Sequence, residues 1–165
     1  QEFPHLSLQW PLALALHQLG TLIWIGGMFF AHFVLRPVAN ERLAPPERLP
    51  LMLAVFDRFF PLVWVAIALL WGSGLWVFLA LAGARMGWHV HAMMTLSALM
   101  TLIFIYIWFS PYRALTQAVA QADWPVAGAR LALIRRLIAT NLTLGLVTAL
   151  LGAAGPTLIA ALSRG

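Results

Sequence analysis

Four long apolar runs alternate with polar stretches along the chain of 165 residues. They cover residues 10–38, 59–81, 87–109 and 131–154, and Pro or Gly lies at most of their ends. The runs are continuous, whereas the strands of a transmembrane barrel alternate between apolar and polar positions. At about 1.5 Å per residue, each run is long enough to cross about 30 Å of hydrocarbon as a helix. The pattern predicts an all-α polytopic membrane protein, a single domain built as a four-transmembrane-helix bundle.

Composition excludes the other broad classes of protein. Hydrophobic residues make up 62% of the chain and charged residues 9%, and the mean hydropathy is +0.89. An ordinary soluble domain carries about 25% charged residues, so both a soluble globular domain and a disordered chain are excluded. The chain has no cysteine. Disulfide frameworks, thiolate metal sites and iron–sulfur clusters are therefore excluded as well.

The distribution of arginine predicts the topology. All ten basic residues are Arg, and eight of them lie on the two links that share one side of the membrane: Arg36, Arg42, Arg48, Arg58, Arg113, Arg130, Arg135 and Arg136. By the positive-inside rule that side is cytoplasmic. Both termini and the short loop at Arg85 are then periplasmic, in a multi-pass protein of a bacterial inner membrane. We interpret Arg135 and Arg136 as anchors at the membrane interface. No signal peptide is expected, because the N-terminus lacks a basic region and a cleavage site.

The two cytoplasmic links also contain helical signals. Residues 46–59 have the pattern of a short amphipathic helix that precedes the second apolar run. Asp123 and Pro125 have the spacing of an N-cap and a first-turn proline. The fourth helix is therefore predicted to begin near Asp123, before it enters the membrane.

Two histidines are candidates for the axial ligands of a haem. His17 lies about 9 Å below the periplasmic start of its helix, and His91 lies about 6 Å below the start of its own. Their similar depth on two helices predicts a bis-histidine haem b in the outer leaflet, since bundle cores hold such groups. Ionisable side chains in an apolar span are functional candidates by default. His32, near the cytoplasmic end of the first run, is interpreted as an interfacial residue.

Small and polar residues share faces with these histidines. At 100° per residue, the face of His17 includes Gly20 and Trp24, and the face of His91 includes Thr95. On the fourth run, Thr148 belongs to a stripe of small and polar residues. We expect these four residues to line the haem pocket. The alternative is that they serve only helix packing, for which membrane helices use the same residue types.

The segment H-V-H-A-M-M at 89–94 is a second candidate metal site. Imidazole and thioether groups suit copper, and thioethers favour Cu(I). The predicted copper ligands are His89, His91, Met93 and Met94, at the outer surface. His89 points about 160° away from His91 on the helix, so one helix cannot place all four side chains around one ion. The two Met residues are equally well interpreted as apolar filling.

Several segments resemble CopD-like membrane proteins, the copper resistance protein D family. They are L-H-Q-L-G-T-L-I-W-I-G-G-M-F-F at 16–30, F-D-R-F-F-P at 56–61, H-V-H-A-M-M at 89–94 and I-R-R-L-I-A-T-N-L-T-L-G at 134–145. The resemblance implies a role in copper uptake across the inner membrane. More distantly the chain is similar to HemJ-like proteins, which implies a haem b bound through the first-helix histidine, here His17. The chain has no Lys to match the basic partner residue of that type.

The sequence leaves three functions open. The first is a haem b-binding protein that transfers electrons near the periplasmic face, a membrane cytochrome b-type oxidoreductase with a quinone or a periplasmic redox partner. The second is copper binding or import. The third is a structural membrane subunit without a cofactor. The long Arg-rich links are compatible with a homodimer.

Overall fold

The computed structural model describes the backbone of residues 6–80 and 87–162, and the side chains of residues 8–80 and 87–155. These residues form helices joined by tight turns, and none of them lies in a β-strand. The predicted all-α class is therefore confirmed. The loop around Arg85 and the residue Arg164, which entered the predicted topology, lie outside the described residues.

The first membrane helix is continuous from Leu6 to Arg42 but changes its winding twice. It consists of α1 (Leu6–Thr21), the π-helical segment η1 (Leu22–Gly26), α2 (Gly27–Phe30), the π-helical segment η2 (Ala31–Leu35) and α3 (Arg36–Arg42). Each π segment is a wider turn within the helix, and such turns are common near functional sites.

The second membrane helix begins earlier than the apolar run predicts. Helix α4 (Pro45–Ala80) is unbroken, with Pro50 and Pro61 inside it. The predicted amphipathic helix at 46–59 and the second run therefore form one element. Proline inside a helix removes one backbone hydrogen bond. Pro61 lies on the exposed side of α4, and membrane helices tolerate such positions.

The second half of the chain follows the prediction closely. Helix α5 (Trp88–Phe109) coincides with the third apolar run, and α6 (Pro111–Ala120) follows after a turn at Ser110. Helix α7 (Trp124–Leu162) begins directly after Asp123. The carboxylate of Asp123 accepts a hydrogen bond of 3.2 Å from the backbone N–H of Val126, which confirms the predicted N-cap.

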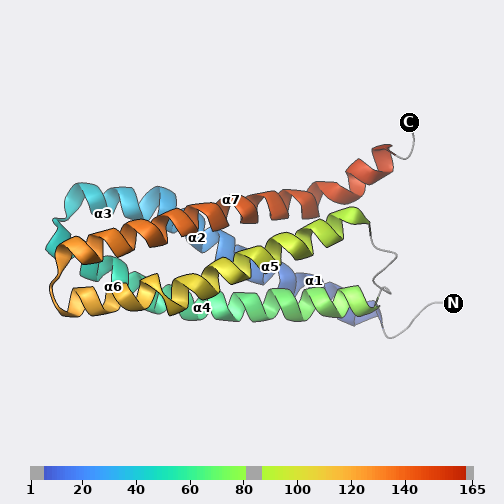
Figure 1. The fold of residues 1–165 in the computed structure, drawn as a ribbon. Coiled ribbons are helices and arrows are strands. Elements are labelled where there is room, and N and C mark those ends of the chain that lie inside the picture. The colour runs from blue at the N-terminus through green and yellow to red at the C-terminus, as the bar shows by residue number, and fades with distance from the viewer. Residues whose placement is uncertain (1–5, 81–86, 163–165) are drawn as a thin grey trace.

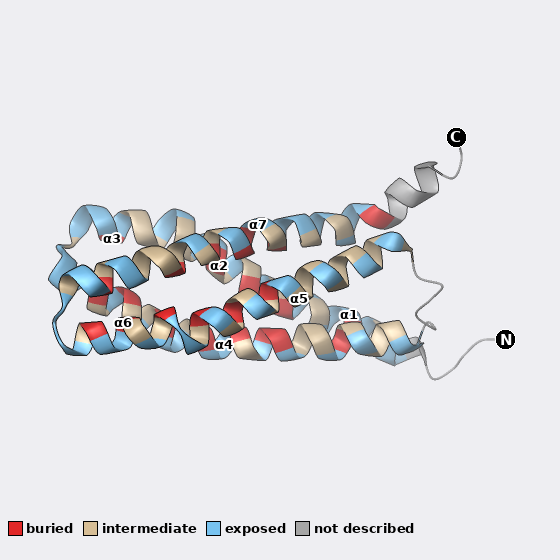
Figure 2. Ribbon diagram, viewed as in Figure 1, coloured by how far each residue is buried: buried red, intermediate tan, exposed pale blue. Residues whose placement is uncertain are grey.

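Four helical stretches are long and apolar enough to cross a membrane: Leu8–Arg42, Pro45–Ala80, Trp88–Ala120 and Trp124–Gly155. Only 17–22% of the most apolar part of each stretch is buried inside the protein. Figure 2 shows buried residues as short patches along helices that are otherwise intermediate or exposed. So much exposed apolar surface requires a lipid environment, and the protein is a multi-pass membrane protein.

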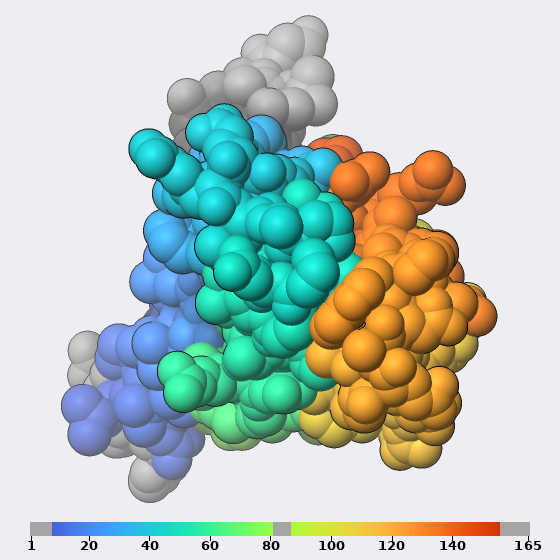
Figure 3. All heavy atoms as spheres, turned by 90° about the vertical axis from the view of Figure 1, so that its left-hand side faces the viewer, coloured from blue at the N-terminus to red at the C-terminus, as the bar shows by residue number. Residues whose placement is uncertain are grey.

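The helices pack in pairs, α1 with α4 and α5 with α7. Helix α1 begins and α7 ends at the same end of the bundle, where α4 ends and α5 begins (Figure 1). At the opposite end, α3 leads into α4 and α6 leads into α7. Viewed from that opposite end, the first turns of α4 lie beside the α6–α7 segment (Figure 3).

Aromatic rings fill the middle of the bundle. The ring of Phe104 on α5 meets Phe60 and Trp64 of α4 edge to face, with centroids 5.4 and 5.2 Å away, and meets Trp24 of η1 at 6.2 Å. Phe60 in turn stacks on Phe56 at 4.9 Å. This aromatic cluster separates a cavity at one end of the bundle from a cavity at the other.

Candidate functional site

A cavity of about 380 Å³ lies between the four membrane helices, on the side of the aromatic cluster where α4 ends and α5 begins. Most of its wall is apolar. The side chains with hydrogen-bonding or metal-binding atoms in the wall are His17, Gln18, Thr21, Trp24, Trp71, Met93, Met94, Ser97, Met100 and Thr148. Trp24 forms part of the wall next to the aromatic cluster. We call this space the His/Met cavity.

The imidazole of His17 is held by the neighbouring helix α4. Its Nδ1 lies 3.0 Å from the hydroxyl oxygen of Ser73, and that hydroxyl lies 2.5 Å from the carbonyl oxygen of Leu69. A serine has one hydroxyl hydrogen, which it donates to the Leu69 carbonyl. With that hydrogen used, the Ser73 oxygen can accept a hydrogen bond from His17 Nδ1, and in that tautomer the neutral ring keeps its lone pair on Nε2. This is the arrangement in which a histidine binds a metal through Nε2 while a second group fixes its orientation.

Two glycines lie where α1 packs on α4. A Cβ on Gly74 would make an ordinary contact of 3.5 Å with Cε1 of His17, so the imidazole packs beside the backbone of α4. A Cβ on Gly20 would lie 2.9 Å from the carbonyl oxygen of Ala66. Gly20 is therefore placed at the contact between the two helices and not in the cavity wall, where the sequence predicts it.

Helix α5 contributes three thioethers to the same cavity, from Met93, Met94 and Met100. Small residues on α7 leave room for two of them. A Cβ on Gly152 would lie 3.7 Å from the sulfur of Met93, and one on Gly145 would lie 3.1 Å from the methyl group of Met100. The cavity therefore combines one imidazole with three soft sulfur ligands.

The structure does not bring His91 and Thr95 to this cavity. His91 is exposed on the outside of α5, with its ring edge-on to Phe78 at a centroid distance of 6.0 Å. Thr95 is also exposed and donates a hydrogen bond to the backbone carbonyl of His91. The two predicted haem ligands, His17 and His91, thus do not face a common space. Of the predicted pocket residues, Trp24 and Thr148 lie in the cavity wall.

The segment H-V-H-A-M-M is divided between different surroundings. Met93 and Met94 face the cavity, and His91 faces outward. His89 packs against Gly155 of α7, where a Cβ would lie 2.9 Å from its ring, and its buried Nδ1 has no hydrogen-bond partner within the described residues. Within those same residues, no three His, Asp or Glu side chains are grouped closely enough to hold a metal ion.

Sequence reasoning did not identify Ser73, Gln18, Ser97 or Met100 as site residues. Ser73 lies in a G-S-G segment, which we interpret from the sequence only as a stretch of small side chains in the second helix. One signal was available, because a serine in an apolar run needs a partner. Its pairing with His17 joins positions 56 residues apart and depends on how the two helices pack.

Comparison with known proteins gives one match. The family model of copper resistance protein D, CopD, matches residues 53–155. No curated protein and no solved structure matches the chain. The matched region covers most of α4, all of α5 and α6, and α7 up to Gly155, which includes Ser73 and the three methionines of the cavity. This four-helix membrane protein therefore belongs to the copper resistance protein D family.

Proposed function

We propose that the protein binds copper as Cu(I) in the His/Met cavity, with His17, Met93 and Met94 as ligands and Met100 within the same wall. The observation that carries the proposal is the cavity itself, in which an oriented imidazole shares an intramembrane space with three thioethers. Membership of the CopD family supports a copper-related role.

The ligand chemistry selects among metal ions. Thioethers are soft ligands that favour Cu(I), and a neutral imidazole suits copper as well. The wall holds no carboxylate, so it lacks the oxygen ligands that Ca²⁺ and Mg²⁺ require. A singly charged ion with neutral ligands also leaves the smallest net charge in an apolar setting, where uncompensated charge is costly.

We infer that this cavity is the entry point of copper import. The predicted topology places it at the periplasmic end, where copper arrives. Beyond it lies the aromatic cluster around Phe104, which supplies no metal ligand. Capture at one end is therefore a separate step from passage through the bundle.

The test is a Cu(I) titration of the purified full chain against a chromogenic chelator under reducing conditions, with copper measured on the same sample. We expect His17→Ala to abolish tight binding and Met94→Leu to weaken it at least tenfold. Two matched controls are expected to bind as wild type: His91→Ala, because His91 faces outward, and Met28→Leu, because Met28 is buried outside the cavity. Wild-type affinity in His17→Ala, or loss of binding in His91→Ala, would overturn the assignment.

Haem b is the second candidate function, and its supporting observation is that His17 lines a space of about 380 Å³. The bis-histidine ligation that the sequence predicts does not fit, because His91 lies outside that space. The same purified sample distinguishes the functions by its absorption spectrum before and after dithionite. A Soret band with sharp bands on reduction would establish haem and reopen the redox role with a quinone or periplasmic partner. A colourless protein without copper would support the structural subunit instead.

A further inference from the structure

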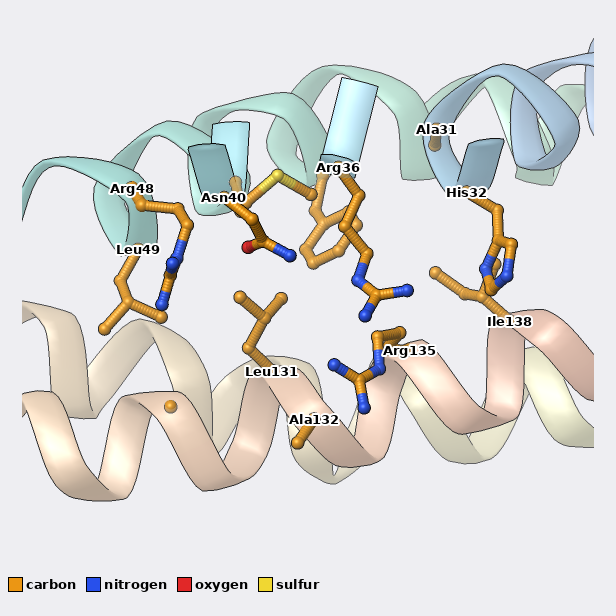
Figure 4. Close-up of a pocket in the computed structure, with 13 residues that line it drawn as sticks. Ala31, His32, Arg36, Asn40, Arg48, Leu49, Leu131, Ala132, Arg135 and Ile138 are labelled. Carbon is orange, nitrogen blue, oxygen red and sulfur yellow. The ribbon is translucent and has the colours of Figure 1, made fainter. Parts of the chain in front are cut away.

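A second cavity, of about 110 Å³, lies at the opposite end of the bundle between α3, the start of α4 and the first half of α7. Its polar wall consists of Arg36, Arg48 and Arg135 together with His32 and Asn40. In Figure 4 the side chains of Arg36 and Arg135 point toward one another from facing helices, and those of Arg48 and Asn40 extend toward α7. We call this space the arginine cavity.

The residues that line the arginine cavity recur every four residues along two helices. His32, Arg36 and Asn40 follow one another at intervals of four residues along the first membrane helix, so they project from one side of it. Arg48, Met52 and Phe56 repeat the same interval along α4. Two helices thus direct one arginine each, Arg36 and Arg48, into the space in front of Arg135.

The charge in this cavity is not balanced by the protein. None of the three guanidinium groups forms an ion pair or hydrogen bond with an acceptor in the described ranges 8–80 and 87–155, and Nε of Arg48 is buried without a partner. The cavity wall holds no acidic residue. Asp57 accepts a hydrogen bond from Tyr112, Asp123 caps α7, and Glu41 and Glu47 are exposed.

Converging cations with unsatisfied donors form a favourable site for an anion from outside the chain. Like charges a few ångströms apart repel, and a buried polar group without a partner costs free energy. Arg36 and Arg135 are near enough for this repulsion to act between them. Guanidinium groups hold phosphate by paired N–H donors, and several of them together form a strong site.

We propose that the arginine cavity binds a phosphate group, supplied either by the headgroup of an anionic lipid or by free inorganic phosphate. The volume of about 110 Å³ is well below the 300 Å³ or more of a site for a drug-sized molecule, so the cavity takes the phosphate and not a whole nucleotide. Basic pockets between membrane helices on the cytoplasmic side bind lipid headgroups, and this end is the one predicted to be cytoplasmic.

The chain provides a matched control at the neighbouring position. Arg135 is half-buried and lines the cavity, whereas Arg136 is exposed and does not line it. Arg135→Gln and Arg136→Gln remove the same charge from the same turn of α7. A specific site responds only to the first, and a general effect of surface charge responds equally to both.

The experiment measures thermal unfolding of the purified full chain in a neutral detergent. One arm titrates inorganic phosphate against chloride at constant ionic strength, and the other adds phosphatidylglycerol or, as a comparison, phosphatidylcholine. We expect phosphate, phosphatidylglycerol or both to raise the unfolding temperature of the wild type and of Arg136→Gln. Arg135→Gln and Arg48→Gln are expected to require at least tenfold more ligand for the same shift.

A second readout does not depend on ligand binding. Without phosphate or anionic lipid, Arg135→Gln is expected to unfold at a higher temperature than the wild type, because it removes the repulsion of Arg36. Saturating ligand reverses that order. A response to phosphate alone assigns the site to free phosphate, and a response to phosphatidylglycerol alone assigns it to a lipid. The proposal is overturned if neither ligand shifts the wild type, or if Arg136→Gln loses as much response as Arg135→Gln.

Discussion

The two cavities of this bundle differ in chemistry although the same helices build both. His17 and His32 lie on one continuous helix, roughly 22 Å apart at 1.5 Å per residue. Around His17 the ligating groups are neutral and soft, with sulfur from three methionines. Around His32 they are three cationic guanidinium groups. The comparison teaches that a small helical bundle can hold a site for a soft metal cation and a site for an anion if the two lie far apart along the same helices.

The aromatic cluster makes this separation effective. Trp24 touches the His/Met cavity, Phe56 touches the arginine cavity, and Phe104 and Phe60 connect them by ring contacts. The rings of that layer carry no metal-ligating atom, and Met28 lies buried in the same core. A copper ion that crossed it toward the arginine cavity would also meet repulsion from three positive charges. The two sites are therefore expected to bind their ligands independently.

The largest expected effect comes from filling one cavity while leaving the other unchanged. Gly74→Leu adds a large side chain to the cavity wall beside the His17 imidazole, so Cu(I) binding should fall to background while the phosphate response stays as in the wild type. Gly72→Leu is the matched control, because a side chain at Gly72 meets nothing within 4 Å. Chelator competition measures the first property and thermal unfolding the second. If Gly74→Leu binds copper as the wild type does, the His/Met cavity is not the copper site and the contrast between the two cavities fails.

A smaller effect should follow from removing the group that orients His17. Ser73→Ala takes away the acceptor for Nδ1, and losing such a supporting group costs about 10–100-fold in metal affinity. Ser97→Ala is the control, since Ser97 lines the same cavity without contacting His17 by any hydrogen bond in the described part of the chain. The Cu(I) titration compares the copper affinities of the two variants. Equal losses in the two variants would mean that polarity of the wall, and not orientation of His17, governs affinity.

The smallest effect tests whether the cavities are coupled through α7. Asn141 is buried between them and donates a hydrogen bond of 3.0 Å to the backbone carbonyl of Met100, while its Oδ1 has no partner in the described ranges. Asn141→Leu loses that bond, worth about 0.6 kcal/mol on average within membranes, and relieves the unpaired oxygen. Reversible unfolding in detergent should therefore change by less than about 1 kcal/mol. Thr140→Val is the control, because Thr140 is the neighbouring exposed residue. If Asn141→Leu changes the affinity for Cu(I) and the affinity for phosphate by more than twofold each, the two cavities are coupled.

Much of the fold is predictable because the bilayer restricts it. The four spans follow from the length of the apolar runs, and the start of α7 follows from Asp123, whose carboxylate does cap the helix. Pro61 was misleading as a helix start, because proline on an exposed face of a membrane helix does not end it. The predicted family is confirmed by a family model that matches residues 53–155, whereas the segment 16–30, which also carries the resemblance, lies outside that match.

The site was harder to predict because lipid is as apolar as the interior of the bundle. Helix α5 is apolar on every side, so its sequence does not indicate which face is turned inward. The prediction chose the face of His91 and Thr95, and the structure turns the face of Met93 and Met94 toward the other helices. The pairing of His17 with Ser73 depends on the same packing.

The two π-helical turns of the first membrane helix set the relative direction of its two ends. Residues 22–26 and 31–35 lie between His17 and Arg36, and each wider turn accommodates extra chain without breaking the helix. Because a wide turn takes up one extra residue, losing a residue there would restore a regular helical turn and leave His17 and Arg36 on their present faces. Losing a residue from the α-helical segment Gly27–Phe30 would instead rotate Arg36 and Asn40 by about 100° about the helix axis, away from Arg135. The wide turns are therefore the places where the first membrane helix can lose a residue without moving one binding site relative to the other.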